Sequence, residues 1–371
     1  MTNTNFLKDT AVAKAFYDEG AFVQTSADGF KVFIGPFKGY SSFAEAQSAR
    51  RSESDPILYN SNFWSFLDRN SPKNEYFTSE KSFECSREQL KLFCAKKDGI
   101  IDNIDWNSVH KAEFQQQYDW IQDQIGHGKL LKALPIALQS GHGDLPLRLP
   151  FILEKIIQQP TVNYSYGFWN SQSGMVGYTP EVLCSWNKNN SELKTMALAG
   201  TWRKNSDQVT PDFSDQKIKD EHNFVIQDIR NQLKSFSLIH QSETTVIELT
   251  HLYHLKTHFV YSCDSIQKYI EAVHLLHPTA ALGLFPREMT MTQEFSQINI
   301  QKTRQQFGAP LGYVSHEEGF MLVAIRNIIW TDRDIQLFAG CGVTKESLFA
   351  DEWQEILAKQ DSVKKMLGVE S

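Results

Sequence analysis

Three charged side chains near the C-terminus have a spacing that could support chemistry. In the segment DEWQEILAK, Glu352, Glu355 and Lys359 stand at positions i, i+3 and i+7, so a helix would project them from one face. Two carboxylates one turn apart suit a hard cation such as Mg²⁺, which takes a few carboxylates together with water and substrate oxygens. Taken alone, the same pattern is more typical of a solvated acidic face with a lysine pair.

Two other segments could add a carboxylate and a place for an anion. Glu221, in the segment IKDEHNFV, could reach the same cation from a second helix, although such a residue usually faces water. In LFAGCGV, a strand runs into a turn around Gly340 and Gly342, where exposed backbone N–H groups could receive an anion. A single G-x-G is a weak signal, because most such segments are simply turns.

Two cationic side chains interrupt apolar runs. Arg326, in VAIRNIIW, would be buried, and a buried guanidinium needs either an internal acid or an anionic ligand. Lys132, in KLLKALPIAL, could lose its proton in an enclosed site and act as a general base, or it could extend to solvent from an edge strand. Glu181 could be a site acid or a turn carboxylate, and His254 alone is most often a core or loop histidine.

The elements that must hold these residues mix strands and helices without a regular β–α repeat. Apolar residues recur at helical spacing in three segments, residues 109–125, 215–233 and 348–366. β-Branched and aromatic residues predict strands within five others, residues 130–138, 162–199, 245–249, 320–330 and 334–338. Pro135 interrupts the first of these, which suggests an edge strand or a bulge. This mixture favours an α+β fold over a doubly wound parallel sheet.

The chain shows no internal repeat and no linker between domains. Residues 1–105 are rich in aromatic and turn-forming residues, which predicts short strands and loops integrated into the fold. Residues 106–371 contain every candidate site residue named above. We therefore expect one catalytic domain over residues 106–371, with an N-terminal portion built into it.

Composition limits the class of partner. The 371 residues carry a net charge of −7, which argues against general binding to nucleic acid or anionic membranes but not against a small anion. No apolar run approaches the roughly 20 residues of a membrane span, and the N-terminus lacks the apolar core of a signal peptide. The five cysteines form no CxxC pair, as is typical of reduced thiols. We expect a cytoplasmic enzyme that acts on a small polyanion.

Taken together and in order, the motifs resemble the chorismate-utilising family of isochorismate, salicylate, anthranilate and aminodeoxychorismate synthases. The resemblance covers residues 110–367 and rests on these segments: KLLKALPIA, GYTPEVL, MALAGTWRK, IKDEHNFV, LYHL, LHPTAALGLFPRE, RQQFGAPLGY, VAIRN and LFAGCGVTKESLFADEWQEILAK. Several motifs in family order are far more specific than any one of them. The resemblance implies an α+β fold with two packed, largely antiparallel sheets and helices on the outside.

The resemblance also assigns a metal site for the substrate chorismate. Glu221 and Glu355 would hold Mg²⁺, with Glu352 nearby through water. The metal would grip the ring carboxylate of chorismate. Lys359 would complete this part of the site.

The remaining substrate contacts follow from the same resemblance. The backbone around Gly340 and Gly342 would support the ring carboxylate, and Arg326 would bind the enolpyruvyl carboxylate. His254 would line the pocket close to the ring. The family is usually monomeric, so we expect a monomer.

The residue at position 132 separates the branches of the family. Isochorismate and salicylate synthases carry a lysine there, which activates water for attack at ring C2, whereas amine-adding members generally carry glutamine. The family's general acid falls at Glu181, which would protonate the leaving 4-hydroxyl. Lys132 therefore implies an isochorismate synthase, a hydroxymutase-type isomerase, with no glutaminase partner, serving menaquinone or siderophore biosynthesis.

The pair Ala281-Leu282 is a second discriminator. Salicylate and anthranilate synthases usually have threonine where Ala281 stands, so alanine favours an enzyme that releases isochorismate. The alternatives are a salicylate synthase, an amine-transferring anthranilate or aminodeoxychorismate synthase subunit, and a degenerate member that binds without turnover. Retention of Lys132, Glu181 and the glutamates argues against the last of these.

Overall fold

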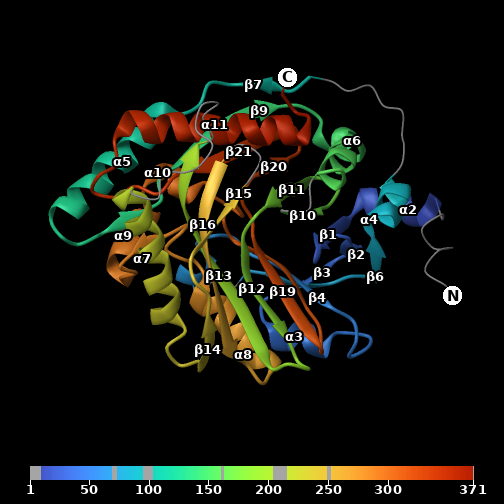
Figure 1. Ribbon diagram of the computed structural model, residues 1–371. Helices are drawn as coiled ribbons and strands as arrows, with labels where there is room; N and C mark the ends of the chain where they lie inside the picture. The colour runs from blue at the N-terminus through green and yellow to red at the C-terminus, as the bar shows by residue number, and fades with distance from the viewer. Residues whose placement is uncertain are drawn as a thin grey trace.

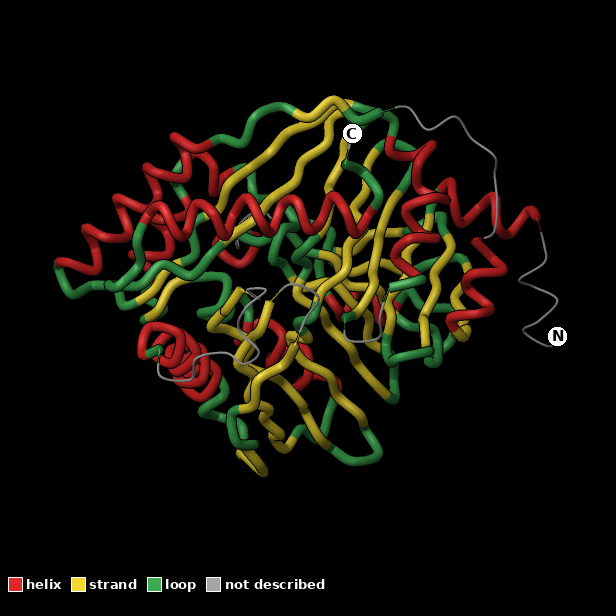
Figure 2. Tube along the Cα trace, turned by 45° about the horizontal axis from the view of Figure 1, so that its top comes forward, coloured by secondary structure: helices red, strands yellow, loops and turns green. Residues whose placement is uncertain are grey.

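The computed structural model describes residues 10–68, 73–94, 103–159, 163–203, 215–248 and 252–370. Within these residues, most strands belong to two large antiparallel sheets, and helices surround the strands (Figures 1 and 2). The α+β architecture predicted from the sequence and the family resemblance is confirmed.

One sheet has nine strands among the described residues. Their order across the sheet is β6 (Lys81–Ser86), β2 (Gly29–Ile34), β1 (Gly20–Gln24), β10 (Tyr164–Trp169), β11 (Ser173–Thr179), β20 (Asn327–Thr331), β21 (Asp334–Gly340), β9 (Ile136–His142) and β7 (Asp105–Trp106). Strand β1 pairs with β10, and β11 pairs with β20. This sheet therefore joins strands from the beginning, middle and end of the chain.

The second sheet is similarly mixed in sequence. Its order in the described chain is β14 (Leu238–Gln241), β16 (Leu252–Ser262), β13 (Glu192–Arg203), β12 (Val182–Asn187), β19 (Glu318–Val323), β18 (Pro310–Val314), β4 (Ile57–Asn60), β5 (Tyr76–Thr78) and β3 (Lys38–Tyr40), with β15 (Thr245–Glu248) also paired to β16. The N-terminal strand β4 pairs with β18. Strands before residue 105 thus enter both sheets, while a domain boundary at that residue stays a prediction.

The helices lie against the sheets and against one another. They are α2 (Thr10–Asp18), α3 (Phe43–Ser48), α4 (Arg87–Cys94), α5 (Lys111–Gly126), α6 (Leu145–Ile157), α7 (Gln216–Gln232), α8 (Ile266–Leu276), α9 (Met289–Ser296), α10 (Asn299–Lys302) and α11 (Phe349–Leu367). Helix α11 packs on β21 and β9, and α7 packs on β13 and β16 (Figure 1). In the described chain, none of these helices combines the length and apolarity needed to cross a bilayer.

Two helices that carry candidate site residues have clear end signals. Asp215 caps α7, because its side chain accepts a hydrogen bond from the backbone N–H of Ile218. Helix α11 ends at Gly368, whose φ of 66° is the left-handed conformation that glycine adopts easily. These signals fix which residues of each helix face the sheets.

The largest apolar cluster contains inward-facing residues of both sheets. It includes Val23 and Phe33 from the first sheet and Leu58 and Leu311 from the second, all of them fully buried. Alternate residues of a strand point to opposite faces, so each sheet contributes one apolar face to this core. The sheets therefore pack face to face and hold their edges and loops in a fixed relation.

The predicted helices correspond to observed ones. Segments 109–125, 215–233 and 348–366 are confirmed as α5, α7 and α11 within two residues at each end. The strand predicted at residues 245–249 is present as β15 through Glu248, and residue 249 lies outside the described residues.

The strand predicted at residues 130–138 is interrupted at Pro135, as expected. The chain breaks around Pro135 into β8 (Lys132–Ala133) and β9. Strand β8 keeps one bridge, from Ala133 to Val343 just beyond β21, and also pairs with β17 (Leu284–Phe285). This second pairing brings Lys132 beside Phe285, after α8.

Gly312 gives a direct test of how tightly β18 and β19 approach each other. A Cβ at this position would fall on the carbonyl oxygen of Phe320 and lie 2.8 Å from Met321 Cα, and backbone atoms cannot rotate away. We expect Gly312→Ala to lower the unfolding free energy by about 2–4 kcal/mol in urea denaturation. Gly126→Ala is the matched control, because a Cβ there meets nothing within 4 Å and should add up to about 1 kcal/mol. Equal stability of the two variants would contradict this packing.

Candidate active site

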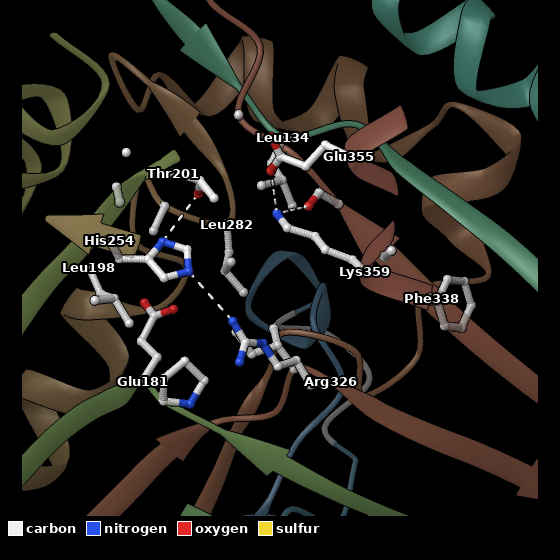
Figure 3. Close-up of a pocket in the computed structure, with 18 of the residues that line it drawn as sticks. Leu134, Glu181, Leu198, Thr201, His254, Leu282, Arg326, Phe338, Glu355 and Lys359 are labelled. Carbon is white, nitrogen blue, oxygen red and sulfur yellow. Dashed lines mark hydrogen bonds and ion pairs between the residues drawn. The ribbon is translucent and has the colours of Figure 1, made fainter. Parts of the chain in front are cut away.

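A small cavity of about 100 Å³ lies between the two sheets, α7 and α11 (Figure 3). Its polar lining residues include Glu181, Thr201, Glu221, His254, Arg326, Glu355 and Lys359. Its apolar lining includes Leu134, Leu198, Ala281, Leu282, Phe307, Phe338 and Val363. The cavity therefore combines an apolar wall with several charged side chains of both signs, as small-ligand sites commonly do.

Helix α11 and the end of β21 form one side of the cavity. Lys359 Nζ donates a hydrogen bond to the carbonyl oxygen of Gly340 at 2.8 Å and pairs with Glu355 Oε1 at 2.7 Å (Figure 3). Burial opposes the charge of Lys359, but Glu355 outweighs it and raises the pKa of the lysine. Lys359 is therefore a fixed cation beside the Gly340 turn.

Two further lysine–glutamate pairs surround this side. Lys132 Nζ lies 3.2 Å from Glu221 Oε1, and Lys217 Nζ lies 2.6 Å from Glu352 Oε1. Burial and the neighbouring Glu355 raise the pKa of Glu352, while Lys217 opposes that rise. Each of the three predicted metal ligands is thus neutralised by a lysine, which lowers the cost of burying carboxylates side by side.

The predicted Mg²⁺ site has suitable donors, each of which now has a lysine partner. Glu221 and Glu355 line the cavity from two helices, and carboxylate oxygens are what Mg²⁺ prefers. The missing side chain of Gly342 leaves the space beside Glu221 and Lys132 open, since a Cβ there would lie 2.7 Å from Lys132 Cε. Among the described residues, no group of three acidic, histidine or cysteine side chains is assembled for a metal. The donor types fit the ion once the lysine pairs open, and the metal itself stays a prediction.

Arg326 and His254 form the opposite side. His254 Nε2 accepts from Arg326 Nη2 at 3.5 Å, and its Nδ1 lies 3.1 Å from the Thr201 hydroxyl (Figure 3). A guanidinium only donates, so Nδ1 carries the proton and donates to Thr201. Burial, with Arg326 and Lys359, lowers the pKa of His254 well below its usual value, and the ring is neutral at physiological pH.

Arg326 itself has an unusual backbone. Its φ of 54° lies in the left-handed region, which is strained for a residue with a side chain. Burial lowers its pKa to about 10, against the opposing effects of Tyr178 and Glu181, so the side chain remains charged at neutral pH. The chain thus holds a half-buried cation at the cavity by a strained bend.

Glu181 faces this same space. The side chain is buried, and burial raises its pKa to about 7, although Lys132, Arg326 and Lys359 each lower it. Figure 3 shows its carboxyl group turned toward His254 and Arg326. A carboxyl group with this pKa can carry a proton near neutral pH, as a general acid must.

The structure brings most of the predicted site residues to the cavity and leaves two outside its lining. Those at the lining are Glu181, Glu221, His254, Ala281, Leu282, Arg326, Gly340, Gly342, Glu355 and Lys359. Lys132 and Glu352 are not, because each is buried against its ion-pair partner. The roles assigned to all these residues stay predictions.

Sequence reasoning missed several residues of the site. Lys217 was not singled out, although it stands four residues before Glu221 on the same helical face, a signal that could have found it. Phe338, which stacks on Phe307 at 5.5 Å, also lines the cavity and was not singled out. Nothing in its local sequence separates it from an ordinary core residue.

The fold and this site are those of a chorismate-binding enzyme. The family model for the chorismate binding enzyme matches residues 65–368, which is most of the chain, so the protein belongs to this family and is an enzyme. The match begins 45 residues before residue 110, where the resemblance in the sequence begins. Part of the N-terminal portion therefore belongs to the family fold.

Curated relatives include two isochorismate synthases from Escherichia coli. The chain is 28% identical to EntC over 59% of this chain and 57% of EntC, and 27% identical to MenF over 79% of this chain and 70% of MenF. The match thus spans little more than half of EntC. The activity of these relatives is transferred to this chain only as a proposal.

Solved structures show the same fold at lower identity. The structure of MenF from Escherichia coli superposes with a TM-score of 0.74 at 19% identity, over 96% of this chain and 90% of that chain. Anthranilate synthase component I from Streptococcus pneumoniae gives 0.69 at 15% identity, over 93% of this chain and 92% of that chain. These superpositions concern the fold and do not separate the family's reactions.

Because the pKa of Glu181 is raised, replacing this glutamate with glutamine should stabilise the fold by an amount that depends on pH. Because the folded pKa of about 7 exceeds the ordinary 4.5, the folded state binds a proton between these values and wild-type stability falls as pH rises through them. We expect Glu181→Gln to raise the unfolding free energy by up to about 3 kcal/mol at pH ~8 and by little below pH ~4. Urea denaturation across this range, with EDTA present, measures the difference. A gain independent of pH would contradict the assignment.

Proposed function

We propose that this protein is a Mg²⁺-dependent isochorismate synthase, which converts chorismate to isochorismate by adding water at C2 and losing the 4-hydroxyl. The observation that carries the proposal is Glu181, a buried carboxyl group with a pKa of about 7 in a cavity that also holds cations. The names of the relatives EntC and MenF support the reaction. Ala281, at the lining, supports release of isochorismate over further conversion to salicylate.

Substrate binding depends on cations at opposite sides of the cavity. Chorismate carries two carboxylates, and the site offers Arg326 on one side and Lys359 beside the Gly340 turn on the other. Charge-assisted hydrogen bonds to carboxylates are stronger than neutral ones. We assign the enolpyruvyl carboxylate to Arg326 and the ring carboxylate to the α11 side, which orients the ring between Glu181 and His254.

The proposed chemistry is an allylic substitution with two proton transfers. Lys132, in its neutral form, accepts a proton as the water oxygen bonds to C2, and both double bonds of the ring diene shift, from C1=C2 and C5=C6 to C1=C6 and C4=C5, as the C4–O bond breaks. Glu181 donates its proton to the 4-hydroxyl, which leaves as water. Lys132 then holds the added proton and Glu181 is anionic, so return of that proton resets the enzyme. One water enters and one leaves, which balances an isomerisation.

This role for Lys132 requires a change from the geometry of the structure. Its ammonium group now pairs with Glu221 and has no hydrogen-bond partner among the described residues. Lys132 can act as a base only when Glu221 turns to another partner. When bound by Glu221 and Glu355, Mg²⁺ would supply positive charge to orient and neutralise the ring carboxylate.

We also propose that the protein is a cytoplasmic monomer that needs no glutaminase partner and supplies isochorismate for menaquinone or siderophore biosynthesis. The lysine at position 132 supports the absence of an amine donor, since the amine-adding branch generally carries glutamine there. The net charge of −7 supports a small-molecule substrate over a nucleic acid.

Product analysis tests the function as a whole. Purified protein is incubated with chorismate and Mg²⁺, with and without ammonium, and with EDTA as the metal-free arm, and products are separated by chromatography. We expect isochorismate, independent of ammonium and abolished by EDTA. Salicylate with pyruvate would identify a salicylate synthase, and an ammonium-dependent aminated product would identify the amine-transferring branch. Chorismate binding without any product would identify a non-catalytic member.

Lys132→Ala tests the proposed base. We expect isochorismate formation to fall by about 10²–10⁴-fold, the usual contribution of general acid–base catalysis, while Mg²⁺-dependent binding of chorismate persists. Lys129→Ala is the matched control, because this lysine is exposed three residues earlier and should leave turnover unchanged. Turnover retained by Lys132→Ala would remove Lys132 from the mechanism.

A further inference from the structure

Arg304 is a completely buried arginine directly behind the cavity wall. Its side chain is 0% exposed, and it stands in the loop between α10 and β18. Nε donates to the carbonyl oxygen of Phe307 at 2.9 Å, and Nη1 donates to that of Leu282 at 3.1 Å. Both acceptor residues line the cavity, whereas Arg304 does not. Arg304 thus touches the wall from its far side.

The charge of Arg304 has no counter-ion in the part of the chain that the structure describes. Its other neighbours are neutral: Gln301 Oε1 at 3.4 Å, the Phe63 ring at 3.3 Å and the Phe307 ring at 5.5 Å. Nη2 has no hydrogen-bond partner. Burial lowers the pKa of the group, but a guanidinium remains protonated at neutral pH even when buried. A positive charge is therefore enclosed with only carbonyl, amide and aromatic partners.

The other cations around the cavity, of which Lys132 is buried and the rest are half-buried, differ from Arg304. Lys132, Lys359 and Arg287 are paired with Glu221, Glu355 and Asp228. Their charges are largely cancelled before any ligand binds. Arg326 forms no ion pair among the described residues, but it lines the cavity and can meet an anion directly. Arg304 alone of these cations is both unpaired and out of reach of a ligand.

Arg304 also belongs to a hydrogen-bond network that reaches a second wall. Gln301 accepts from Arg304 Nη1 and donates to the side chain of Gln117 and to the carbonyl oxygen of Leu134, another lining residue. Two residues before Leu282, the backbone N–H of Ala280 donates a hydrogen bond to Asp228 at 2.8 Å. Arg304 and Asp228 thus both help to hold the segment that carries Ala281 and Leu282.

We propose that Arg304 is a positioning residue for an anionic substrate: its uncompensated charge favours a dianion across the Leu282–Phe307 wall, while its hydrogen bonds fix that wall. This inference rests on the proposed function, because chorismate is the dianion. A burial this complete is expensive for a charge without a partner. The hydrogen bonds to Phe307 and Leu282 explain why donors are needed here, but a neutral glutamine amide is also a donor, so hydrogen bonding does not by itself require a positive charge. An anion in the cavity supplies the missing opposite charge through a low-dielectric wall.

The test separates charge from hydrogen bonding with two variants. Arg304→Gln removes the charge and keeps an N–H donor on a shorter side chain. Arg304→Lys keeps the charge but loses the planar guanidinium that donates to two carbonyl oxygens at once. We expect KM for chorismate to rise about tenfold in Arg304→Gln, as a unit charge one side chain away implies at an effective dielectric near 20, with kcat changed less than about threefold. Arg304→Lys should stay within about threefold of wild type in KM. The KM ratio between Gln and Lys variants should persist in high salt, because buried charges are poorly screened.

Controls keep the result interpretable. Arg230→Met removes one positive charge from an exposed site on α7 and should leave KM unchanged. Thermal unfolding without substrate should show Arg304→Gln no less stable than Arg304→Lys, because loss of an unpaired buried charge offsets the lost hydrogen bonds. Wild-type KM in Arg304→Gln, or equal KM and equal destabilisation in both variants, would overturn the inference and leave the proposed function intact. A wild-type chain that neither binds nor converts chorismate would overturn both.

Discussion

The site depends on placing many charges in a small enclosed space without making the fold unstable. Glu221 and Glu355 line one end of the cavity and Glu352 is buried on the same helix as Glu355, and buried carboxylates repel one another when water is excluded. Lys132, Lys217 and Lys359 each pair with one of them at 3.2 Å or less. The pairing explains how α7 and α11 can pack with acidic residues facing inward. It also means that any cation entering the site must compete with lysines already present.

The geometry of these pairs depends in turn on the short strand β8. Ala133 stays bridged to Val343, just beyond β21, in the same register as the β9–β21 pair, and β8 also pairs with β17. These two partners hold Lys132 between Glu221 and the open space at Gly342. The pairing of β8 with β17 also fixes the end of the loop that carries Ala281 and leads to Phe285.

How far the sequence could predict this structure follows from the range of each interaction. The helical faces of Glu352, Glu355 and Lys359 were predictable, because i+3 and i+4 spacing is a local property. The partners of Lys132 and Lys217 were not, since they lie 89 and 135 residues away and no local pattern encodes such distances. Motif order supplied the fold and most of the lining because it carries information about the whole family. It could not reveal that Lys132 would lie outside the lining in this state.

The N-terminal portion shows why residues without motifs can still matter to a site. Phe63 covers the guanidinium of Arg304, and its carbonyl oxygen lies 2.8 Å from His277 Nε2, which must therefore donate. Burial lowers the pKa of His277 to about 3, so this donor is a neutral ring and adds no second positive charge beside Arg304. The segment before β5 thus seals one unpaired cation from water while leaving it uncompensated. Exclusion of water strengthens the electrostatic field of Arg304 across the Leu282–Phe307 wall, because water would otherwise screen the charge. Phe63 follows β4, which pairs with β18, and its backbone N–H donates a hydrogen bond to the carbonyl oxygen of Gln305 at 2.7 Å, so these contacts hold Phe63 beside Arg304.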